Sequence, residues 1–268
     1  MTKSDITDFT AVDRADDPRF FQRFLDKGNE NRELRVCKGI IIDGLRLSPG
    51  AHVLDIGCGL GADVFDLAGR VGPGGRVQGI DISAGMIEEA RIRSLRLGLP
   101  VTFDVGDAQE LRFANETFDA CRLERVLMHV PDATRALAET VRVTKRGGRV
   151  SVFDFDWDLS LIDSPAKETT RKVVRSFSDG MKNGWIGRQL PRRFKEAGLD
   201  DVSVSSHMLF VDLPFLELLI GGHLAKAGDG GTFERGELEQ WWEHLHAATA
   251  GGTFFAGFTA FIVAGTRA

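Results

Sequence analysis

Residues 52–61 read His-Val-Leu-Asp-Ile-Gly-Cys-Gly-Leu-Gly, and this stretch decides the fold. The largely apolar run before the first glycine predicts a short buried strand of a parallel sheet. Gly57, Gly59 and Gly61 then alternate, a pattern used where the backbone turns tightly or approaches a ligand closely. A helical pattern opens at Ala62, and the start of a helix offers free N–H groups to polar atoms. The stretch therefore predicts a nucleotide-type site at the carboxyl end of a first strand.

Two details of this loop indicate which ligand it binds. The dinucleotide fingerprint is G-x-G-x-x-G, whose third glycine allows close packing of helix on strand, whereas the spacing here is G-x-G-x-G. Asp55 also stands two residues before the first glycine. A carboxylate there does not help to bind a pyrophosphate, but it can hold an ammonium group. The loop therefore favours a ligand that carries a nucleoside and a cationic amine.

Strand and helix patterns alternate along the first 155 residues, which predicts a parallel sheet flanked by helices. The expected strands are 52–56, 76–81, 101–105, 118–123 and 149–155, and the helices between them are 62–71, 84–97 and 132–144.

The alternation stops after Asp158. We expect a helical insertion at about 157–186, a helix at 187–197, a strand at 201–213, a second insertion at 214–250 and a last strand at 254–266. No crossover helix of normal size precedes the last strand, so it is expected to be antiparallel. The prediction is a doubly wound α/β fold with a mostly parallel seven-stranded sheet.

Two domains of unequal size are expected. Residues 1–50 form an N-terminal helical cap, whose first 16 residues are polar and expected to be mobile, followed by amphipathic helices at 19–45. Residues 51–268 form a Rossmann-like ligand-binding domain. The cap and the two insertions together would make a helical lid.

The composition narrows the class of protein. The chain has 268 residues and a net charge of -5 with no long basic run, which argues against a nucleic-acid surface. It has neither an 18-residue apolar stretch nor a signal peptide pattern, and its three cysteines are widely spaced. We expect a reduced cytoplasmic enzyme with no metal site and no membrane partner. Because the chain has no tyrosine, no phenol serves in the site.

Candidate ligand-binding residues follow the second and third strands. Asp81 ends the second strand, where an acid accepts hydrogen bonds from ribose hydroxyls; the alternative is a helix cap, a role for which Ser83 is better placed. Ile82 and Met86 adjoin it, and Met86 is either an adenine contact or a core residue. After the third strand, Asp107 is a candidate for accepting a hydrogen bond from the amino group of adenine; the alternative is that it belongs to an acidic turn. The candidate segment as a whole is Gly106, Asp107, Ala108 and Gln109.

Four segments in this order resemble the class I S-adenosylmethionine-dependent methyltransferases: 53–61, 79–86, 106–111 and 118–131. The resemblance covers about residues 50–155 and is strongest to the small-molecule branch, which includes quinone-ring C-methyltransferases and sugar or polyketide O-methyltransferases. It implies that the three glycines, with Cys58 between them, bind the amino-acid part of S-adenosylmethionine. It further implies that Asp81 binds the ribose and that Asp107 and Ala108 bind the adenine.

Glu124 and Arg125 follow the fourth strand, on the side of the cofactor's reactive end. Glu124 is a candidate for holding the methionine ammonium, and Arg125 for holding a carboxylate of the cofactor or the acceptor. A structural ion pair between the two explains them equally well.

His129 occupies the position where some sugar O-methyltransferases of this branch have a proposed general base. An imidazole can take a proton from an attacking hydroxyl, and Asp154 on the next strand is a candidate for orienting it. The alternative is that His129 only packs, because methyl transfer depends mainly on in-line positioning.

Aromatic residues in or beside the expected lid are candidates for lining an apolar acceptor pocket. Core packing is the alternative for most of them. The pocket candidates are Phe20, Phe21, Trp157 and Trp185. Four further aromatic residues also lie in or beside the expected lid: Phe210, Phe215, Trp241 and Trp242.

The sequence thus predicts methyl transfer from S-adenosylmethionine to an oxygen, nitrogen or carbon atom of a small organic acceptor, with S-adenosylhomocysteine as product. A homodimer is also expected. One alternative is a protein that binds S-adenosylmethionine without methylating. The other is a nicotinamide-dependent reductase, which the misplaced third glycine and the missing tyrosine disfavour.

Overall fold

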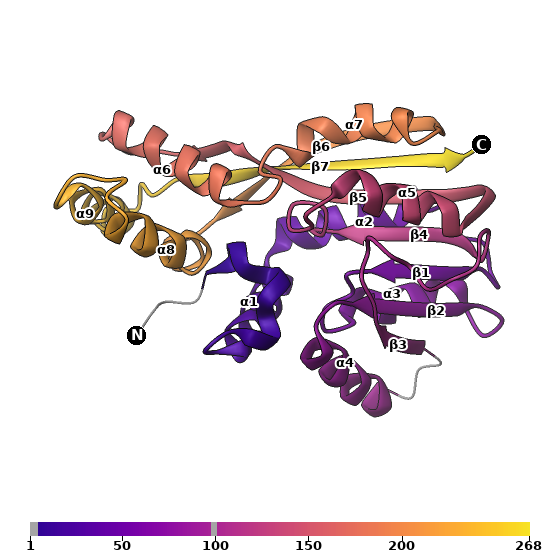
Figure 1. Ribbon diagram of the computed structural model, residues 1–268. Coiled ribbons are helices and arrows are strands. Elements are labelled where there is room, and N and C mark those ends of the chain that lie inside the picture. The colour runs from indigo at the N-terminus through magenta and orange to yellow at the C-terminus, as the bar shows by residue number, and fades with distance from the viewer. Residues whose placement is uncertain (1–4, 98–100) are drawn as a thin grey trace.

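The computed structural model describes residues 5–97 and 101–268, and these residues form a seven-stranded sheet in the order β3-β2-β1-β4-β5-β7-β6 (Figure 1). Strand β7 is antiparallel to both of its neighbours, and the other pairs in the sheet are parallel. The predicted α/β fold with an antiparallel last strand is confirmed. The strands are β1 (His52–Ile56), β2 (Arg76–Asp81), β3 (Val101–Val105), β4 (Phe118–Glu124), β5 (Thr144–Ile162), β6 (Leu199–Val211) and β7 (Ala256–Arg267).

Ten helical segments surround the sheet in the described part of the chain. Several begin at an Asp or Asn whose side chain accepts a backbone N–H of the first turn, as Asp17, Asn31, Asp132 and Asp212 do. The helices are η1 (Ile6–Arg14), α1 (Pro18–Glu30), α2 (Arg32–Gly44), α3 (Ala62–Val71), α4 (Ala84–Leu97), α5 (Ala133–Val143), α6 (Lys167–Gly180), α7 (Ile186–Glu196), α8 (Leu213–Asp229) and α9 (Glu237–Ala250).

Helices cover both faces of the sheet. Gly44 at the end of α2 closely approaches Ala264 of β7, whereas Gly187 of α7 closely approaches Phe261 of the same strand. Residues three apart on a strand point to opposite faces, so α2 and α7 pack on opposite sides. The central strands are therefore shielded from water on both sides, which is why β1 and β4 consist mainly of buried residues.

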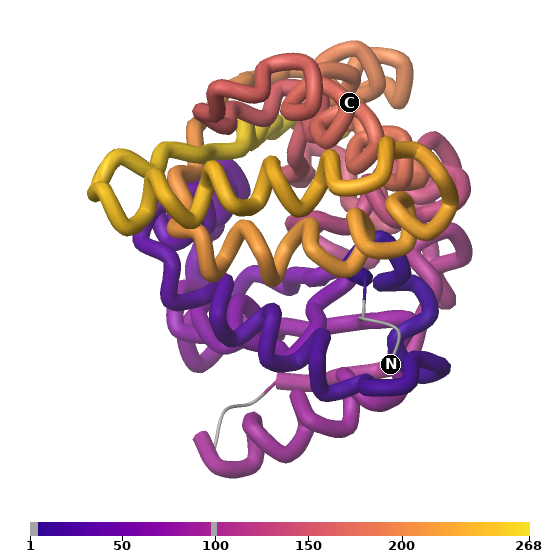
Figure 2. The backbone as a smooth tube through the Cα atoms, turned by 90° about the vertical axis from the view of Figure 1, so that its left-hand side faces the viewer, coloured from indigo at the N-terminus to yellow at the C-terminus, as the bar shows by residue number. Residues whose placement is uncertain are grey.

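Helices α1, α6, α8 and α9 lie toward the carboxyl ends of the parallel strands (Figure 1). Seen from that end, the indigo N-terminal segments and the gold helices α8 and α9 lie across the molecule (Figure 2). Lys226 of α8 joins the two groups, because its Nζ lies 3.2 Å from Asp5 Oδ2 and 2.8 Å from Asp8 Oδ2. These helices form the covering layer over the strand ends. No helix in the described ranges is both long and apolar enough to cross a membrane.

Two expectations about local structure were wrong. Residues 6–14, expected to be mobile, form η1, because Ile6 and Val12 are buried and Asp13 accepts hydrogen bonds from Ser83 Oγ (2.5 Å) and Ala84 N (2.8 Å). Residues 157–162, expected in a helical insertion, extend β5 instead and pair with β7, as Leu161 does with Gly257. Residues 1–4 lie outside the described part of the chain.

The buried centre of β5 provides a test of the core. Phe153 is 0% exposed, so Phe153→Ala is expected to lower the free energy of unfolding by about 3–5 kcal/mol through lost burial and the cavity left behind. Leu95→Ala on α4, where the side chain is 82% exposed, is the control and should change it by less than about 0.5 kcal/mol. Urea denaturation measures both, and equal effects would contradict the assigned core.

Candidate active site

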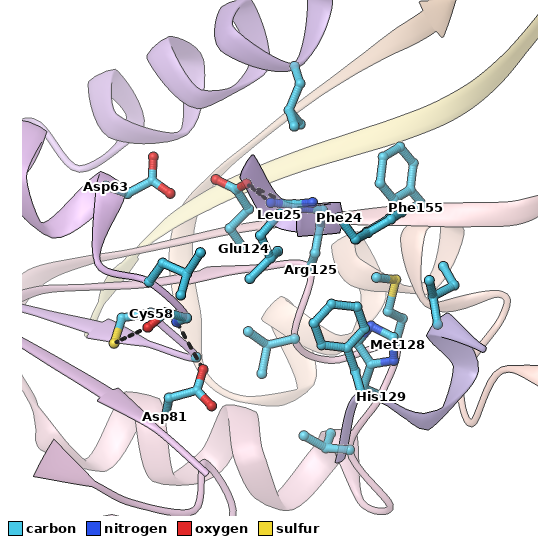
Figure 3. A pocket seen from close by; sticks show the side chains of 18 of the residues that line it. Phe24, Leu25, Cys58, Asp63, Asp81, Glu124, Arg125, Met128, His129 and Phe155 are labelled. Carbon is cyan, nitrogen blue, oxygen red and sulfur yellow. Dashed lines mark hydrogen bonds and ion pairs between the residues drawn. The ribbon is translucent and has the colours of Figure 1, made fainter. Parts of the chain in front are cut away.

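A large cavity opens at the carboxyl ends of the strands, beneath the covering helices (Figure 3). About 1470 Å³ of space, its open mouth included, lies between the surrounding atoms. The structure brings most of the predicted site residues to its wall. They are Gly57, Cys58, Gly59, Asp81, Ile82, Gly106, Asp107, Ala108, Gln109, Glu124, Arg125, His129 and Trp157.

The glycine loop has a backbone that other residues rarely adopt. Gly57, Gly59 and Gly61 have φ angles of 73°, 51° and 80°, all in the left-handed region that favours glycine. A Cβ at Gly57 would collide with the side chain of Val126. Gly59 N donates a hydrogen bond of 2.9 Å to Asp81 Oδ2 (Figure 3). The loop is therefore held open, with bare backbone facing the cavity at Gly57 and Gly59.

Asp81 is fixed by two backbone donors. Its Oδ2 accepts from Gly59 N and its Oδ1 accepts from Ser83 N at 2.9 Å. Burial raises the pKa of this carboxyl, and the two backbone hydrogen bonds oppose the shift. Each carboxylate oxygen has more than one acceptor position, so Asp81 keeps capacity to accept from the hydroxyls of a ligand. Ser83 also accepts from Met86 N at 3.1 Å, as its predicted role at the start of α4 requires.

The loop after β3 is organised by a second carboxylate. Asp107 Oδ1 accepts from Gln109 N at 2.8 Å, and Gln109 Oε1 accepts from Asp132 N at 2.9 Å. The loop is thereby tied to the start of α5. Asp107 and Gln109 thus present polar atoms to the cavity beside Asp81.

A network of six charged side chains lies behind the glycine loop. Its centre is Arg122 of β4, whose guanidinium lies 2.8 Å from Asp55 Oδ1 on β1 and 3.1 Å from Asp63 Oδ2 on α3 and also contacts Glu124. Three carboxylates and three cations balance in charge. The members are Lys38, Asp55, Asp63, Arg122, Glu124 and Arg125.

The side of this network that lines the cavity is formed by Lys38, Asp63, Arg122, Glu124 and Arg125. Lys38 Nζ lies 2.5 Å from Asp63 Oδ2 and 3.0 Å from Glu124 Oε1, and Arg125 Nη2 lies 2.9 Å from the same Glu124 oxygen. Burial opposes ionisation of Asp63, but the charges of Arg122 and Lys38 outweigh it and hold its pKa well below the usual range. Asp63 is therefore an anion on the cavity wall. Glu124 and Arg125 do form the ion pair that the sequence left as an alternative.

Asp55 lies behind the wall rather than on it. Asp55 and Arg122 are register partners on adjacent strands, so the carboxylate turns toward Arg122 and is 0% exposed. Burial raises its pKa to about 6, against the attraction of Arg122. The acids that line the cavity at this end are Asp63 and Glu124.

Five other predicted residues also lie away from the cavity wall. Met86 and Phe21 pack together with Val12 and Leu60 in a small separate core, because all four are buried between the N-terminal segment and α4. Phe20 packs beside that core. Trp185 is 48% exposed, and its ring lies 4.4 Å from the guanidinium carbon of Arg188 on the outer surface. Gly61 turns toward Phe103 and Ala90.

The expected pairing of Asp154 with His129 is not formed. Asp154 Oδ2 accepts from Leu127 N at 2.9 Å, so the carboxyl holds the loop after β4 instead. Burial raises the pKa of Asp154 to about 8. His129 lines the cavity, and its ring packs 5.1 Å from that of Phe9. Burial, followed by the charge of Arg125, lowers the pKa of His129 to about 3, so the imidazole is neutral at physiological pH.

The sequence interpretation missed Lys38, Asp63 and Arg122. Arg122 carried a signal, since an arginine in the middle of a buried strand requires partners. Lys38 falls on the helical face of Leu34 and Ile41, which is otherwise apolar. Within the described residues, no group of three or more His, Cys, Asp or Glu side chains is arranged to hold a metal ion.

A family model described as a methyltransferase domain matches residues 47–198, which is more than half of the chain and contains the glycine loop. The chain belongs to this methyltransferase family. An uncharacterized 37.1 kDa protein in transposon TN4556 of Streptomyces fradiae is 36% identical over 90% of this methyltransferase and 69% of its own length. Aklanonic acid methyltransferase DauC of Streptomyces sp. is 35% identical over 54% of this chain and 66% of its own length.

A solved structure shares the fold of this methyltransferase. Geranyl diphosphate C-methyltransferase from Streptomyces coelicolor, bound to S-adenosyl-L-homocysteine, has a TM-score of 0.55 and 19% identity and covers 87% of this chain and 79% of its own. The family model, rather than this structure, confirms the predicted family and with it the cofactor S-adenosylmethionine. The residues present fit this cofactor, since the glycine loop leaves bare backbone at the cavity and Asp81 retains free acceptor positions.

The glycine loop gives a direct test of the cofactor site. Gly57→Ala places a Cβ against Val126 at a left-handed φ, so the loop must shift and no longer presents the same backbone to the cofactor. Affinity for S-adenosylhomocysteine should fall about tenfold or more, the equivalent of about 1.4 kcal/mol. Gly39→Ala on α2, where a Cβ meets nothing within 4 Å, is the control. Calorimetric titration measures both, and unchanged affinity in Gly57→Ala would place the cofactor elsewhere.

Asp154 predicts a pH dependence of stability. Its pKa is about 8 in the folded protein and about 3.9 in an unfolded chain, so between pH 5 and 8 the folded state holds a proton that the unfolded state has lost. This contribution to the free energy of unfolding then falls by up to about 1.4 kcal/mol for each pH unit gained.

Asp154→Asn removes that titration while keeping the shape of the side chain. The variant is therefore expected to gain stability relative to the wild type as the pH rises from 5 to 8 in urea denaturation. Asp179→Asn, at an exposed position of α6, is the control. A stability difference for Asp154→Asn that stays constant over this range would show that Asp154 is already ionised at pH 5.

Proposed function

We propose that this methyltransferase transfers the methyl group of S-adenosylmethionine to an oxygen, nitrogen or carbon atom of a small organic acceptor, as a cytoplasmic enzyme of secondary metabolism. One observation carries the proposal. A single cavity joins the glycine loop, Asp81 and Asp107 to a wall of aromatic side chains, so a nucleoside cofactor and an apolar acceptor can lie in contact. DauC, named for an aklanonic acid substrate, supports an organic acceptor.

Different residues of the cavity would bind the ribose, the adenine and the amino-acid part of the cofactor. Asp81 would accept hydrogen bonds from the ribose hydroxyls, and the loop of Asp107 and Gln109 would contact the adenine edge. Asp63 and Glu124 suit the ammonium of the amino-acid part, and Lys38, on the same part of the wall, suits its carboxylate. When bound, S-adenosylmethionine supplies a methyl group made electrophilic by the adjacent sulfonium.

The chain's own contribution to the transfer is mainly positioning. An acceptor hydroxyl or amine must lose a proton when it is methylated. His129 lines the cavity as a neutral imidazole that can take this proton. Its lowered pKa makes it a weak base, so in-line placement of the acceptor contributes most of the rate.

Mass spectrometry with methyl-labelled S-adenosylmethionine and a small-molecule extract of the source organism tests the function. A labelled product together with S-adenosylhomocysteine is the expected result, and heat-denatured protein is the control. Intact S-adenosylmethionine, despite calorimetric binding, would favour a protein that binds the cofactor without methylating. Binding of a nicotinamide cofactor in place of S-adenosylmethionine would favour the reductase.

The role of His129 can be tested separately with the acceptor that the labelled product identifies. His129→Gln is expected to lower kcat about 100-fold, the low end for general-base catalysis, with cofactor affinity unchanged. His246→Gln on α9, where the side chain is 58% exposed, is the control. Because the pKa of His129 is about 3, its basic form persists from pH 8 down to 5, and kcat should show no inflection near 6.5. Such an inflection, lost in His129→Gln, would contradict this assignment.

The proposal includes a homodimer and excludes nucleic-acid and membrane partners. The net charge of -5 supports the exclusion of nucleic acid. Light scattering coupled to size exclusion tests the dimer.

A further inference from the structure

The half of the cavity that faces away from the nucleotide side is lined by aromatic rings. They come from the covering helices and from the ends of β5 and β7, and they pack against one another: Phe24 lies 5.8 Å from Phe215, and Trp157 lies 4.6 Å from Phe155 and 5.4 Å from Phe258. Such a wall suits a flat ring system. The rings that line the cavity are Phe9, Phe24, Phe155, Trp157, Phe215 and Phe258.

Most charged side chains of the cavity lie in the other half, and Arg125, which reaches the middle of the cavity beside Phe24, is paired with Glu124 (Figure 3). Figure 3 shows Asp63, Asp81 and Glu124 on one side and Phe155, Met128 and His129 on the other. Within the described residues, the charged groups that line the cavity are five of the six members of the network, all but Asp55, and the two acids at the strand ends, Asp81 and Asp107. A charged group on the acceptor would lose its hydration against the aromatic rings without gaining a partner.

Within the described residues, three side-chain atoms of cavity-lining residues are buried without a hydrogen-bond partner: Asn29 Oδ1, His129 Nδ1 and Arg122 Nε. The last belongs to the charged network, which leaves Asn29 Oδ1 and His129 Nδ1 for a ligand. Asn29 lies on α1, and His129 is more than nine-tenths buried. A buried acceptor without a donor costs about 1–3 kcal/mol, a cost that a ligand hydroxyl would remove. An amide oxygen accepts hydrogen bonds and does not donate them, so the partner of Asn29 Oδ1 must be a donor.

We propose that the acceptor is an uncharged, flat ring compound with a hydroxyl group that donates a hydrogen bond to Asn29 Oδ1. This inference rests on the proposed function and narrows its acceptor to a phenol or an enol on an otherwise apolar ring system. His129 Nδ1 provides a second polar contact in the same cavity. Asn29 acts here as a specificity-determining residue.

Three naphthalenes test the three parts of the inference in calorimetric titrations of the full chain saturated with S-adenosylhomocysteine. 1-Naphthol carries the ring and the donor, 1-methoxynaphthalene lacks the donor, and 5-hydroxy-1-naphthoate adds a negative charge. 1-Naphthol should bind about fivefold more tightly than 1-methoxynaphthalene, the equivalent of one hydrogen bond. It should bind at least about tenfold more tightly than the carboxylate.

Asn29→Ala separates the hydrogen bond from the apolar contact. The variant should bind 1-naphthol and 1-methoxynaphthalene equally while its affinity for S-adenosylhomocysteine stays unchanged. Asn115→Ala, at an exposed position after β3 that bonds Arg142, is the matched control and should keep the preference for 1-naphthol. Thermal unfolding of both variants checks that they are folded.

Several results would overturn the inference. They are equal or tighter binding of the carboxylate, a preference for 1-naphthol that survives in Asn29→Ala, or no binding of either neutral ring. A separate titration of S-adenosylhomocysteine into the full chain distinguishes a failure of this inference from a failure of the proposed function. If S-adenosylhomocysteine binds and the neutral rings do not, the acceptor class is wrong and the methyltransferase proposal stands; if S-adenosylhomocysteine does not bind, the proposed function fails.

Discussion

The arginine in the centre of the sheet is the constraint on which the site depends. Arg122 is 1% exposed, and a buried cation is tolerated only when opposite charges surround it closely. Asp55 on β1, Asp63 on α3 and Glu124 at the end of β4 supply those charges. Removing any one of them would leave an uncompensated buried charge, so these elements are bound to a single relative arrangement. That arrangement places the glycine loop beside the end of β4.

The same network connects the N-terminal helices to the sheet. Lys38 of α2 completes the charge balance by pairing with Asp63 and Glu124, and Asp13 in η1 caps the start of α4. The cap is therefore held to the sheet by the two ion pairs of Lys38 and to α4 by the hydrogen bonds of Asp13. Its apolar side chains then close the other half, which gives the cavity its division into a polar and an aromatic part.

Local patterns predicted the nucleotide-binding half of the fold well. Strands β1, β2 and β3 and helix α4 begin and end where apolar runs, glycines and Ser83 indicate, because these elements obey short-range rules. The extension of β5 to Ile162 was missed, since it results from pairing with β7 almost 100 residues later. The 3-10 helix η1 was missed because its sequence is polar, and its order comes from two buried side chains and from Asp13.

The sequence by itself determined the methyltransferase fold, its cofactor and the positions of the candidate cofactor residues, because the glycine loop, Asp81 and Asp107 are encoded within a few residues of the strand ends. The tertiary structure decided what the charged and aromatic side chains do. It placed Asp55 behind the wall, separated Asp154 from His129, and brought Asn29 of α1 to the wall of the cavity. The positions and partners of these side chains depend on which residues distant in the sequence become neighbours. Burial and charge compensation therefore determine them only once the chain has folded.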